Sequence, residues 1–300
     1  MLLKFIDRKI RQAFSDSAYQ YEVLANLQKE IGRELTKKIE IVPMGTIEIS
    51  SGSSSATSAS AKGLTASGGK IESSRESRIE EPFSHILDVG MGTGWLTNRL
   101  GLLFPEAKVV GIDFADGMVE HAKKKEGSFA VIQANARSLP FKENTFDFVV
   151  SNLAFQWVED LTEAFHSSYV ALKSNGKIYL TMFGQNTLKE LFIALEQSLD
   201  VSSRALPIKR LASQPQIEQA LKEAGFDNWE ISCEAIKVHF EDMMALIKWL
   251  KKTGANIREK DIFVGKDLLA RANEYYMEHF KDSWGVCASF EIVWVKAGKK

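Results

Sequence analysis

The residues with the clearest chemical potential form a glycine-rich loop, ILDVGMGTG, at residues 86–94. An apolar run typical of a buried strand ends near Asp88, and Gly90, Gly92 and Gly94 then lead into a helical pattern. Glycine tolerates positive φ angles and lets the backbone approach a ligand without interference from a Cβ atom. In open α/β sheets, ligands bind at the carboxyl ends of the strands. The loop therefore predicts a ligand site, with the Asp88 carboxylate at its edge.

The spacing of this loop helps to distinguish between ligand classes. Dinucleotide-binding loops follow a GxGxxG pattern, in which the third glycine packs the helix against the strand. This chain has GxGxG, with Asp88 two residues before Gly90. A carboxylate at that position suits a ligand with an α-amino group and a sulfonium better than it suits a pyrophosphate. A dinucleotide site and a purely structural turn stay open as alternatives.

Further polar residues follow the next two expected strands. Asp113 ends the run VVGID, where a carboxylate can accept hydrogen bonds from two ribose hydroxyls; the alternative role, N-cap of the next helix, is filled better by Asp116. Met118 lies just inside that helix, where a thioether either covers an adenine face or packs in the core. Asn135 and Ala136 lie at the end of the third run, where Asn can accept a hydrogen bond from an adenine amine. In this order and spacing, these residues predict a nucleotide-like cofactor.

Alternating strand and helix patterns from position 85 onward supply the frame for these residues. Five apolar runs, HILDVG, AKVVGID, FAVIQAN, FDFVVSN and GKIYLTMF, are separated mainly by helical patterns. Such an alternation favours right-handed crossovers and a parallel sheet, and nearly continuous apolar strands indicate helices on both faces. We therefore expect an α/β fold with a doubly wound, mostly parallel sheet of the Rossmann-like type.

The rest of the chain is expected to add helices around this core. Residues 5–39 repeat apolar side chains at spacings of three and four, which predicts N-terminal helices. Residues 50–77 are rich in Ser, Gly, Ala and Thr, and bury too little apolar surface to offset the entropy of ordering. The expected boundaries are an N-terminal helical lid at 1–45, a disordered Ser/Gly-rich insert at 46–80, a core at 81–240 and 281–300, and a helical cap inserted before the last strand at 241–280.

Composition limits the possible functions. The chain has 300 residues, 45% of them hydrophobic, and a formal net charge of -1. These values are typical of a globular protein and argue against a general attraction to nucleic acid. The start shows no signal-peptide pattern and no apolar run is long enough to cross a membrane, so we expect a cytoplasmic protein. Cys233 and Cys287 are far apart and the five histidines are scattered, which favours neither a disulfide framework nor a metal site.

Several segments together match a known family. Four segments resemble class I S-adenosylmethionine-dependent methyltransferases of the methyltransferase-11 type: DVGMGTG, GIDFADGM, the loop SLPF and the run FDFVVSNLAFQW. Four further segments are similar to biotin-pathway malonyl-[acyl carrier protein] O-methyltransferases. They are the N-terminal AFSDSAYQYEVLANLQ, SNLAFQW at 151–157, GQNTLKEL at 184–191 and FEDMMALIKWLKKTGAN at 240–256. The resemblance covers nearly the whole chain except the insert. It implies S-adenosylmethionine as methyl donor, and no metal.

The resemblance also implies the reaction: methylation of the free carboxylate of a malonyl group on acyl carrier protein, early in biotin synthesis. A carboxyl has a reference pKa near ~4, so the nucleophile is already ionised and no residue is expected to act as acid or base. A cation should hold the carboxylate, with an Arg fork as the best geometry, and the basic segment 248–260 would dock an acidic carrier. Ordinary exposed lysines and aromatic lid packing are the alternatives. The expected substrate residues are Tyr21, Gln156, Trp157, Arg210, Lys251 and Lys252, and the expected cofactor residues are Asp88, Gly90, Gly92, Gly94, Asp113, Met118, Asn135, Ala136 and Asn152.

The chain also departs from the family pattern. Asn135 and Met91 stand where the family usually has Asp and Cys, and both changes would weaken cofactor affinity. A family Tyr that contacts substrate would fall near Cys287 and Ala288. Other functions stay open: a small-acid carboxyl methyltransferase resembling those acting on trans-aconitate, a quinone methyltransferase, and a cofactor-binding scaffold protein. The intact Asp88 and glycine loop argue against the scaffold, and we expect a monomer.

Overall fold

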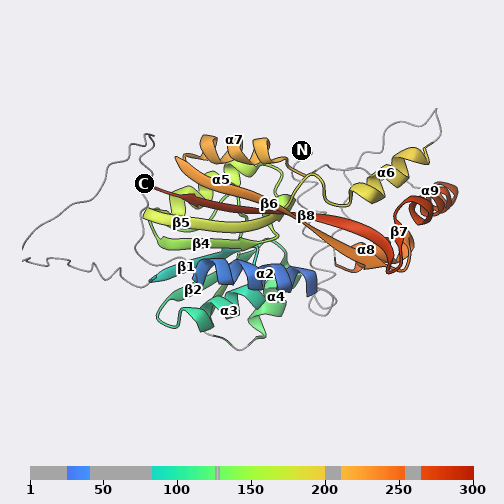
Figure 1. Cartoon of the computed structure of the whole chain (residues 1–300). Coiled ribbons are helices and arrows are strands. Elements are labelled where there is room, and N and C mark those ends of the chain that lie inside the picture. Colours follow the sequence, from blue (N-terminus) through green and yellow to red (C-terminus); the bar gives the residue numbers. More distant parts are fainter. Residues whose placement is uncertain (1–25, 41–82, 126, 128, 200–210, 254–264) are drawn as a thin grey trace, which may run out of the picture.

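The computed structural model describes residues 26–40, 83–125, 127, 129–199, 211–253 and 265–300 (Figure 1). The predicted Ser/Gly-rich insert at 46–80 lies outside the described residues. Two of the predicted substrate residues, Tyr21 and Arg210, lie outside them as well. The fold described below therefore concerns the sheet, its flanking helices and the helices carried beyond it.

The described strands form a mixed sheet of eight strands in the order β3-β2-β1-β4-β5-β8-β6, with β7 paired to β8. Its parallel strands are β1 (His85–Val89), β2 (Lys108–Asp113), β3 (Phe129–Gln133), β4 (Phe146–Asn152) and β5 (Leu172–Phe183). Its antiparallel strands are β6 (Asn228–Phe240), β7 (Lys281–Asp282) and β8 (Gly285–Gly298). Strand order reverses between β1 and β4, which is the usual ligand position in a doubly wound sheet. The predicted doubly wound, mostly parallel fold is confirmed.

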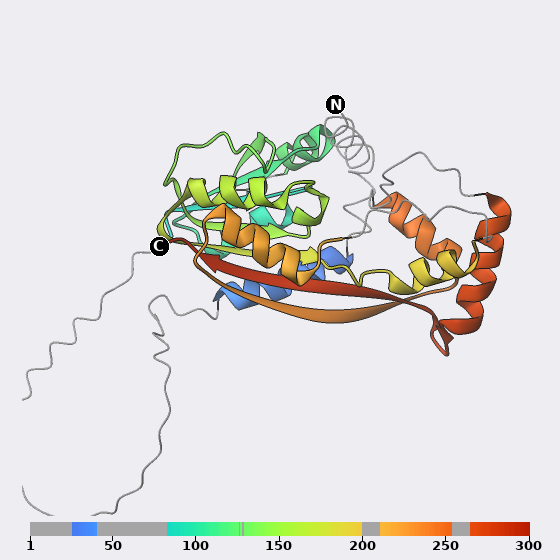
Figure 2. The same ribbon diagram turned by 90° about the horizontal axis from the view of Figure 1, so that it is seen from above.

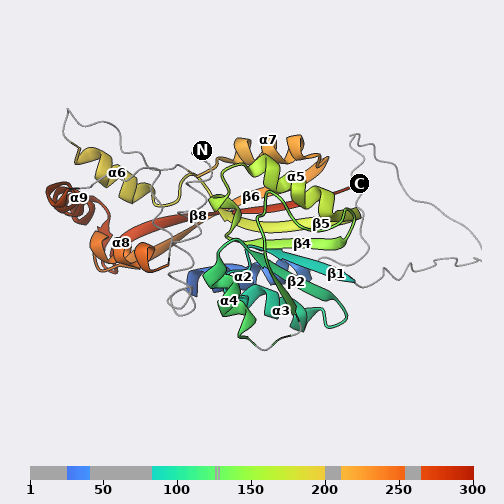
Figure 3. The ribbon, with the colours of Figure 1, turned by 180° about the vertical axis from the view of Figure 1, so that it is seen from behind.

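Helices cover both faces of the sheet because strand side chains alternate between two apolar clusters. The helices beside the core sheet are α2 (Asn26–Glu40), α3 (Trp95–Leu103), α4 (Asp116–Lys123), α5 (Leu161–Ala171) and α7 (Gln214–Ala224). In β1, Ile86 packs in the cluster that includes residues of α2 and α3, and Leu87 packs in the cluster that includes residues of α5 and α7. Figures 1 and 3 show these helices on opposite sides of the sheet. Central strands therefore need apolar side chains at nearly every position.

The start of α4 differs from the prediction that Asp116 caps this helix. Ala115 is the N-cap residue and Asp116 is the first helical residue. The Ala115 N–H donates to Asp113 Oδ1 at 2.8 Å, so the carboxylate that ends β2 also holds the start of α4. Asp116 still lies in the first turn, where the helix dipole favours a negative charge.

Strands β6 and β8 continue past the core and carry a group of helices beyond it (Figure 2). This group consists of α6 (Lys189–Gln197), α8 (Met243–Lys252) and α9 (Lys266–His279), here called the cap helices. Helices α8 and α9 fall within the predicted cap, whereas α6 comes from the range predicted for the core. Leu191 and Leu195 of α6 belong to the same apolar cluster as Ala272 and Tyr276 of α9, and the two helices are in contact. Helix α6 therefore belongs with the cap helices in space.

Asp147 of β4 joins the starts of β1 and β5 at the end of the sheet opposite to the glycine loop. Its Oδ2 accepts hydrogen bonds from Ser84 N at 2.9 Å and from Ser84 Oγ and His85 N at 2.8 Å, and its Oδ1 accepts from Lys173 Nζ at 2.7 Å. Partial burial acts to raise the pKa of this carboxyl, but the bonds from Lys173, Ser84 and His85 outweigh burial and lower the pKa. The ionised Asp147 therefore stabilises this end of the sheet.

We expect Asp147→Asn to lower the free energy of unfolding at pH 7 by about 1–2 kcal/mol, because it removes charge-assisted hydrogen bonds. The folded state has the lower pKa, so this stabilisation is present above about pH 4 and is lost as the pH falls below that value. Urea unfolding at neutral and acid pH measures both effects. The control Asp227→Asn removes only an exposed ion pair with Lys300 and should change stability by less than about 0.5 kcal/mol. Equal losses in the two variants would contradict the expectation.

Candidate functional site

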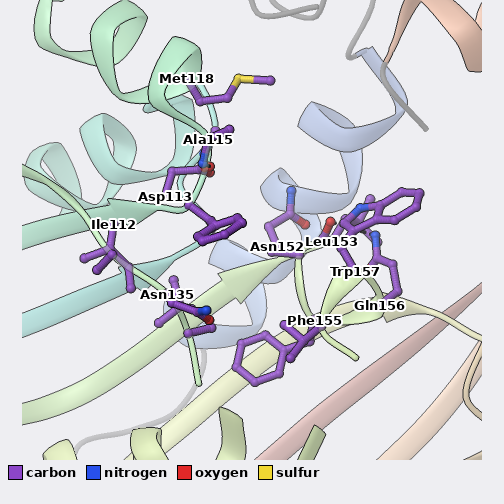
Figure 4. A pocket seen from close by; sticks show the side chains of 18 of the residues that line it. Ile112, Asp113, Ala115, Met118, Asn135, Asn152, Leu153, Phe155, Gln156 and Trp157 are labelled. Atoms are coloured by element: carbon purple, nitrogen blue, oxygen red, sulfur yellow. Dashed lines mark hydrogen bonds between the residues drawn. The ribbon is translucent and has the colours of Figure 1, made fainter. Parts of the chain in front are cut away.

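A cavity of about 1050 Å³, counted out to its open mouth, lies at the carboxyl ends of β1, β2 and β4 (Figure 4). Gly90 and Gly92 line it after β1, Asp113 lines it at the end of β2, and Asn152 lines it at the end of β4. A smaller cavity of about 400 Å³ is lined by Asp88 and shares Gly90, Gly92 and Asn152 with the first. The two cavities therefore adjoin each other at the reversal of strand order.

The glycine loop takes a backbone shape that other residues rarely adopt. The φ angles of Gly90 and Gly92 are 75° and 56°. The Gly90 N–H donates to Ile112 O at 2.8 Å, which ties the loop to the neighbouring strand. A Cβ atom on Gly90 would overlap the Cβ of Ala154, which also lines the larger cavity. Gly90 is therefore needed both for the conformation of the loop and for its close approach to Ala154, which follows β4.

Gly94 has a different role from Gly90 and Gly92. It is the N-cap residue of α3 with a φ of 81°, and it is not among the residues that line either cavity. A Cβ there would lie 3.2 Å from Ala122 Cβ and 3.6 Å from the Phe129 ring. Of the three predicted cofactor glycines, the structure brings Gly90 and Gly92 to the site and leaves Gly94 as a packing position.

Asp88 is fully buried in the wall of the smaller cavity. Thr97 Oγ1 donates to Asp88 Oδ2 at 2.7 Å, while Asp88 Oδ1 has no hydrogen-bond partner among the described residues. Burial, helped by the nearby charge of Asp113, raises the pKa of Asp88 to about 7. A buried carboxylate oxygen without a partner is unfavourable until a donor reaches it. An ammonium group is the donor that fits this position best.

Asp113 is held rigidly at the end of β2. Its Oδ2 accepts a hydrogen bond from Gly92 N and its Oδ1 accepts one from Ala115 N, both at 2.8 Å. Burial outweighs these bonds and raises the pKa of Asp113 to about 6. A carboxylate has about four lone-pair sites, so Asp113, which lines the cavity, keeps acceptor capacity for a ligand hydroxyl beyond its backbone bonds.

The far side of the larger cavity is suited to a flat, largely apolar ring. Ile112 and the buried Met118 line it together with Phe114. Asn135 and Ala136 line it as well, beside the start of the loop after β3. Asn135 Oδ1 already accepts from Arg137 N at 3.0 Å, so an adenine amine would share that oxygen with the backbone. This side of the site fits a nucleoside base.

Helix α2 contributes a residue that sequence reasoning missed. Gln28 is buried, lines both cavities, and has a side-chain oxygen without a hydrogen-bond partner among the described residues. Asn152 Nδ2 donates to the Gln28 backbone O at 2.9 Å, and Asn152 Oδ1 accepts from Thr181 Oγ1 at 2.8 Å. Asn152 therefore positions α2 over the site in addition to lining it. Gln28 lies at the end of AFSDSAYQYEVLANLQ, the N-terminal stretch that resembles the family, and this was the available signal.

Gln156 and Trp157 follow β4 in a short 3-10 helix (Phe155–Trp157), and both line the larger cavity (Figure 4). The buried Gln156 donates from Nε2 to Leu153 O at 2.7 Å, and its Oε1 has no partner among the described residues. Phe155 fixes the short helix by stacking on Phe165, with the ring centroids 5.2 Å apart. The structure thus brings both predicted substrate residues to the site.

The predicted cations on α8 do not reach the cavity. Lys251 and Lys252 are exposed, and neither is among the described residues that line it. The next residue, Thr253, is buried and lines the cavity, which sequence reasoning missed although LKKTGAN matched the family. Among the described lining residues, Arg137 is the one with a permanent positive charge, and its Nη1 lies 3.8 Å from Glu163 Oε2.

Two further findings concern only the part of the chain that the structure describes. Within it, no three His, Cys, Asp or Glu side chains are grouped so that they could hold a metal ion. None of the helices in that part combines the length and the apolar character needed to cross a membrane.

Comparison with known proteins adds to this geometry. Residues 87–180 match a family model described as a methyltransferase domain. The chain is 30% identical to the malonyl-[acyl-carrier protein] O-methyltransferase of Hahella chejuensis over 95% of this chain and 88% of the relative. It is 28% identical to the enzyme of the same name from Gallionella capsiferriformans over 98% of this chain and 91% of the relative.

Solved structures show the same fold. The YcgJ protein from Bacillus subtilis has a TM-score of 0.51 at 17% identity, covering 73% of this chain and 93% of that chain. A putative methyltransferase from Bacillus halodurans has a TM-score of 0.51 at 20% identity, covering 73% of this chain and 94% of that chain.

A doubly wound sheet, a glycine loop after β1 and two carboxylates at adjacent strand ends define a class I S-adenosylmethionine-dependent methyltransferase. The unpartnered Asp88 oxygen fits the amino group of that cofactor, Asp113 fits its ribose, and the Met118 side fits its adenine. Within this class, the chain belongs to the malonyl-[acyl-carrier protein] O-methyltransferase family.

Proposed function

We propose that this chain transfers the methyl group of S-adenosylmethionine to the free carboxylate of a malonyl thioester on acyl carrier protein. The two relatives above, which are named for this reaction, align with 98% and 95% of this chain, so the alignments include both the core and the cap. Many methyltransferases share the core alone, so a match that includes the cap supports a shared substrate. The small-acid and quinone alternatives become outcomes of the test.

The chemistry of the cavity lining carries this proposal. The described residues that line the larger cavity include no histidine, cysteine, lysine or tyrosine, and Asp113 accepts hydrogen bonds from backbone N–H groups. This described lining suits a nucleophile that is already ionised, as a carboxylate is at neutral pH. Bound S-adenosylmethionine supplies an electrophilic methyl carbon: the carboxylate oxygen bonds to it as the carbon–sulfur bond breaks, which yields a methyl ester and a neutral thioether.

The protein contributes orientation and removal of water. Asp88 and Asp113 hold the two polar parts of the methyl donor, as described above. Leu153, Trp157 and Phe183 line the cavity at the ends of β4 and β5, where an apolar wall strips water from an incoming carboxylate. Alignment of two bound reactants can supply several kcal/mol of the barrier reduction. Arg210 stays our prediction for the cation that holds the carboxylate, with Tyr21 closing over the methyl donor.

Mass spectrometry of malonyl-[acyl carrier protein] after incubation with the protein and S-adenosylmethionine tests the proposal. We expect a gain of one methyl group, removed by mild ester hydrolysis and absent with Asp88→Asn. Unmodified carrier, together with methylation of a free small acid such as trans-aconitate, would overturn the proposed substrate. Methylation of a quinone precursor alone would overturn carboxyl chemistry as well.

A further inference from the structure

Helix α8 has two unlike faces. Met243, Leu246 and Leu250 are buried against the cap and recur at spacings of three and four. The exposed residues are Met244, Lys248, Lys251 and Lys252, and residues separated by three or four positions share one side of a helix. This exposed side, here called the α8 lysine face, combines an apolar side chain with three positive charges.

Within the described part of the chain, the lysines of this face are not paired with acidic side chains. Lys248, Lys251 and Lys252 form no ion pair or hydrogen bond through their side chains among the described residues, and α8 contains no acidic residue. Asp242 precedes the helix, but its Oδ1 accepts from Ala245 N at 2.7 Å as the N-cap. Among the described residues, acidic charge therefore lies at the start of the helix, and positive charge without a described partner lies towards its C-terminal end.

Stability of the helix alone does not explain this arrangement. Lys251 and Lys252 do lie in the last turn, where the helix dipole favours cations. Lys248, however, lies three and four positions before them, and like charges at those spacings destabilise a helix. The three lysines thus repel one another in the free protein. A negatively charged partner would remove that repulsion.

The C-terminal end of α8 adjoins the active site. Thr253 follows Lys252 directly, is fully buried and lines the larger cavity. Its N–H donates to Trp249 O at 3.1 Å, so Thr253 is held by the last turn of α8. Figure 2 shows α8, in orange, between the core and the red helix α9. A protein bound on the α8 lysine face would therefore sit beside the cavity wall.

We propose that the α8 lysine face, Met244, Lys248, Lys251 and Lys252, is the docking surface for an acidic acyl carrier protein. This inference builds on the proposed function: docking there places the tethered malonyl thioester at the Thr253 side of the cavity. Charge complementarity speeds the encounter, and Met244 offers an apolar contact within the charged surface. Of the two roles that the sequence predicted for Lys251 and Lys252, this inference keeps recognition of the carrier by the basic segment 248–260 and drops direct binding of the malonyl carboxylate.

Charge reversal separates docking from chemistry. The triple variant Lys248→Glu/Lys251→Glu/Lys252→Glu should lower kcat/KM for malonyl-[acyl carrier protein] by at least about tenfold. With malonyl-pantetheine, which lacks the carrier, kcat/KM should change by less than about twofold, because the lysines do not line the cavity. The corresponding triple Gln variant should give an intermediate loss with the carrier. The control Lys222→Glu reverses an exposed cation in the last turn of α7 and should leave both substrates unaffected.

Binding provides a readout that does not depend on turnover. Fluorescence anisotropy of labelled malonyl-[acyl carrier protein], without methyl donor, should show weaker binding to the triple Glu variant and a steep loss of wild-type binding with added salt. If the triple Glu variant binds malonyl-[acyl carrier protein] with the same affinity as the wild-type protein, the proposed docking surface is wrong, while the proposed function still stands. Methylation of malonyl-pantetheine but not of the carrier would also overturn docking. If neither substrate is methylated, the proposed function fails, and the anisotropy result alone decides whether the lysines bind the carrier.

Discussion

Asp88→Asn should greatly weaken cofactor binding and at the same time make the free protein more stable at neutral pH. The Asp88 carboxylate is fully buried, and one of its oxygens has no partner among the described residues. The variant loses the charge that balances an ammonium group, and we expect at least about 100-fold weaker binding of S-adenosylmethionine, since hydrogen bonds between charged buried groups are worth several kcal/mol. It also removes the unfavourable burial of a negative charge.

The pH dependence gives the sign of the stability change. Folding raises the pKa of Asp88 from 3.8 to about 7, so the folded state binds the proton more tightly than the unfolded state. The contribution of Asp88 to stability is therefore most favourable below about pH 4 and falls as the pH rises towards 7, by up to roughly 4 kcal/mol at 1.36 kcal/mol per pKa unit. Asparagine cannot ionise, so Asp88→Asn should gain on the order of 3 kcal/mol at pH 8 and show a flatter pH profile.

Thermal unfolding with and without S-adenosylmethionine, at several pH values, measures both effects. Wild-type protein should be stabilised by the cofactor, and the variant should have a higher Tm alone but no cofactor-dependent shift. Asp147→Asn serves as the opposite case, because its carboxyl has a lowered pKa and its loss is destabilising. Unchanged cofactor affinity in Asp88→Asn would remove Asp88 from the binding site.

Gly90→Ala should cost stability and activity together. Gly90 has a φ of 75°, which costs an alanine about 1–2 kcal/mol, and the new Cβ would overlap the Cβ of Ala154. Overpacking of this kind typically costs about 1–3 kcal/mol more. Ala154 lines the cavity, so relief of the overlap would displace the chain that carries Gln156 and Trp157. We expect a loss of about 2–5 kcal/mol in unfolding free energy and a large fall in kcat/KM.

Two further variants identify the cause of that loss. Gly265 is the N-cap residue of α9, has no positive φ, and has no described atom within 4 Å of a new Cβ, so Gly265→Ala should cost only the poorer helix cap, about 1 kcal/mol or less. The double variant Gly90→Ala/Ala154→Gly removes the Cβ overlap and should recover the packing part of the loss, but not the conformational part. A Gly90→Ala protein as stable as Gly265→Ala would show that the loop accepts a side chain.

The sheet and the cofactor end of the site were predictable because their signals are local and strong. Strands β1, β2 and β4 are covered on both faces, and this demands the continuous apolar runs seen in the sequence. The glycine loop and Asp113 stand directly after two of these strands, so their placement follows from the fold itself. The resemblance to the family then led to the prediction of the residues after β4, including Gln156 and Trp157.

The substrate end depended on contacts that local patterns do not report. Gln28 reaches the site because Asn152, 124 residues away, holds its backbone oxygen. Helix α6 looks like any helix after a strand, and only its packing on α9 assigns it to the cap. Lys251 and Lys252 are a different case: Leu246, Leu250 and Thr253 already mark the inner side of α8, and this spacing indicates that both lysines face solvent.

The long pairing of β6 with β8 has a consequence for how the molecule comes apart. The two strands are in register from Asn228 opposite Gly298 to Phe240 opposite Val286, running from the core to the cap without interruption. Over part of its length β8 also pairs with β5 of the parallel sheet. The cap helices are therefore attached to strands that continue into the core, and the strand part of the cap cannot separate without breaking ladder hydrogen bonds. Cap and core should behave as one cooperative unit in unfolding and in native-state hydrogen exchange.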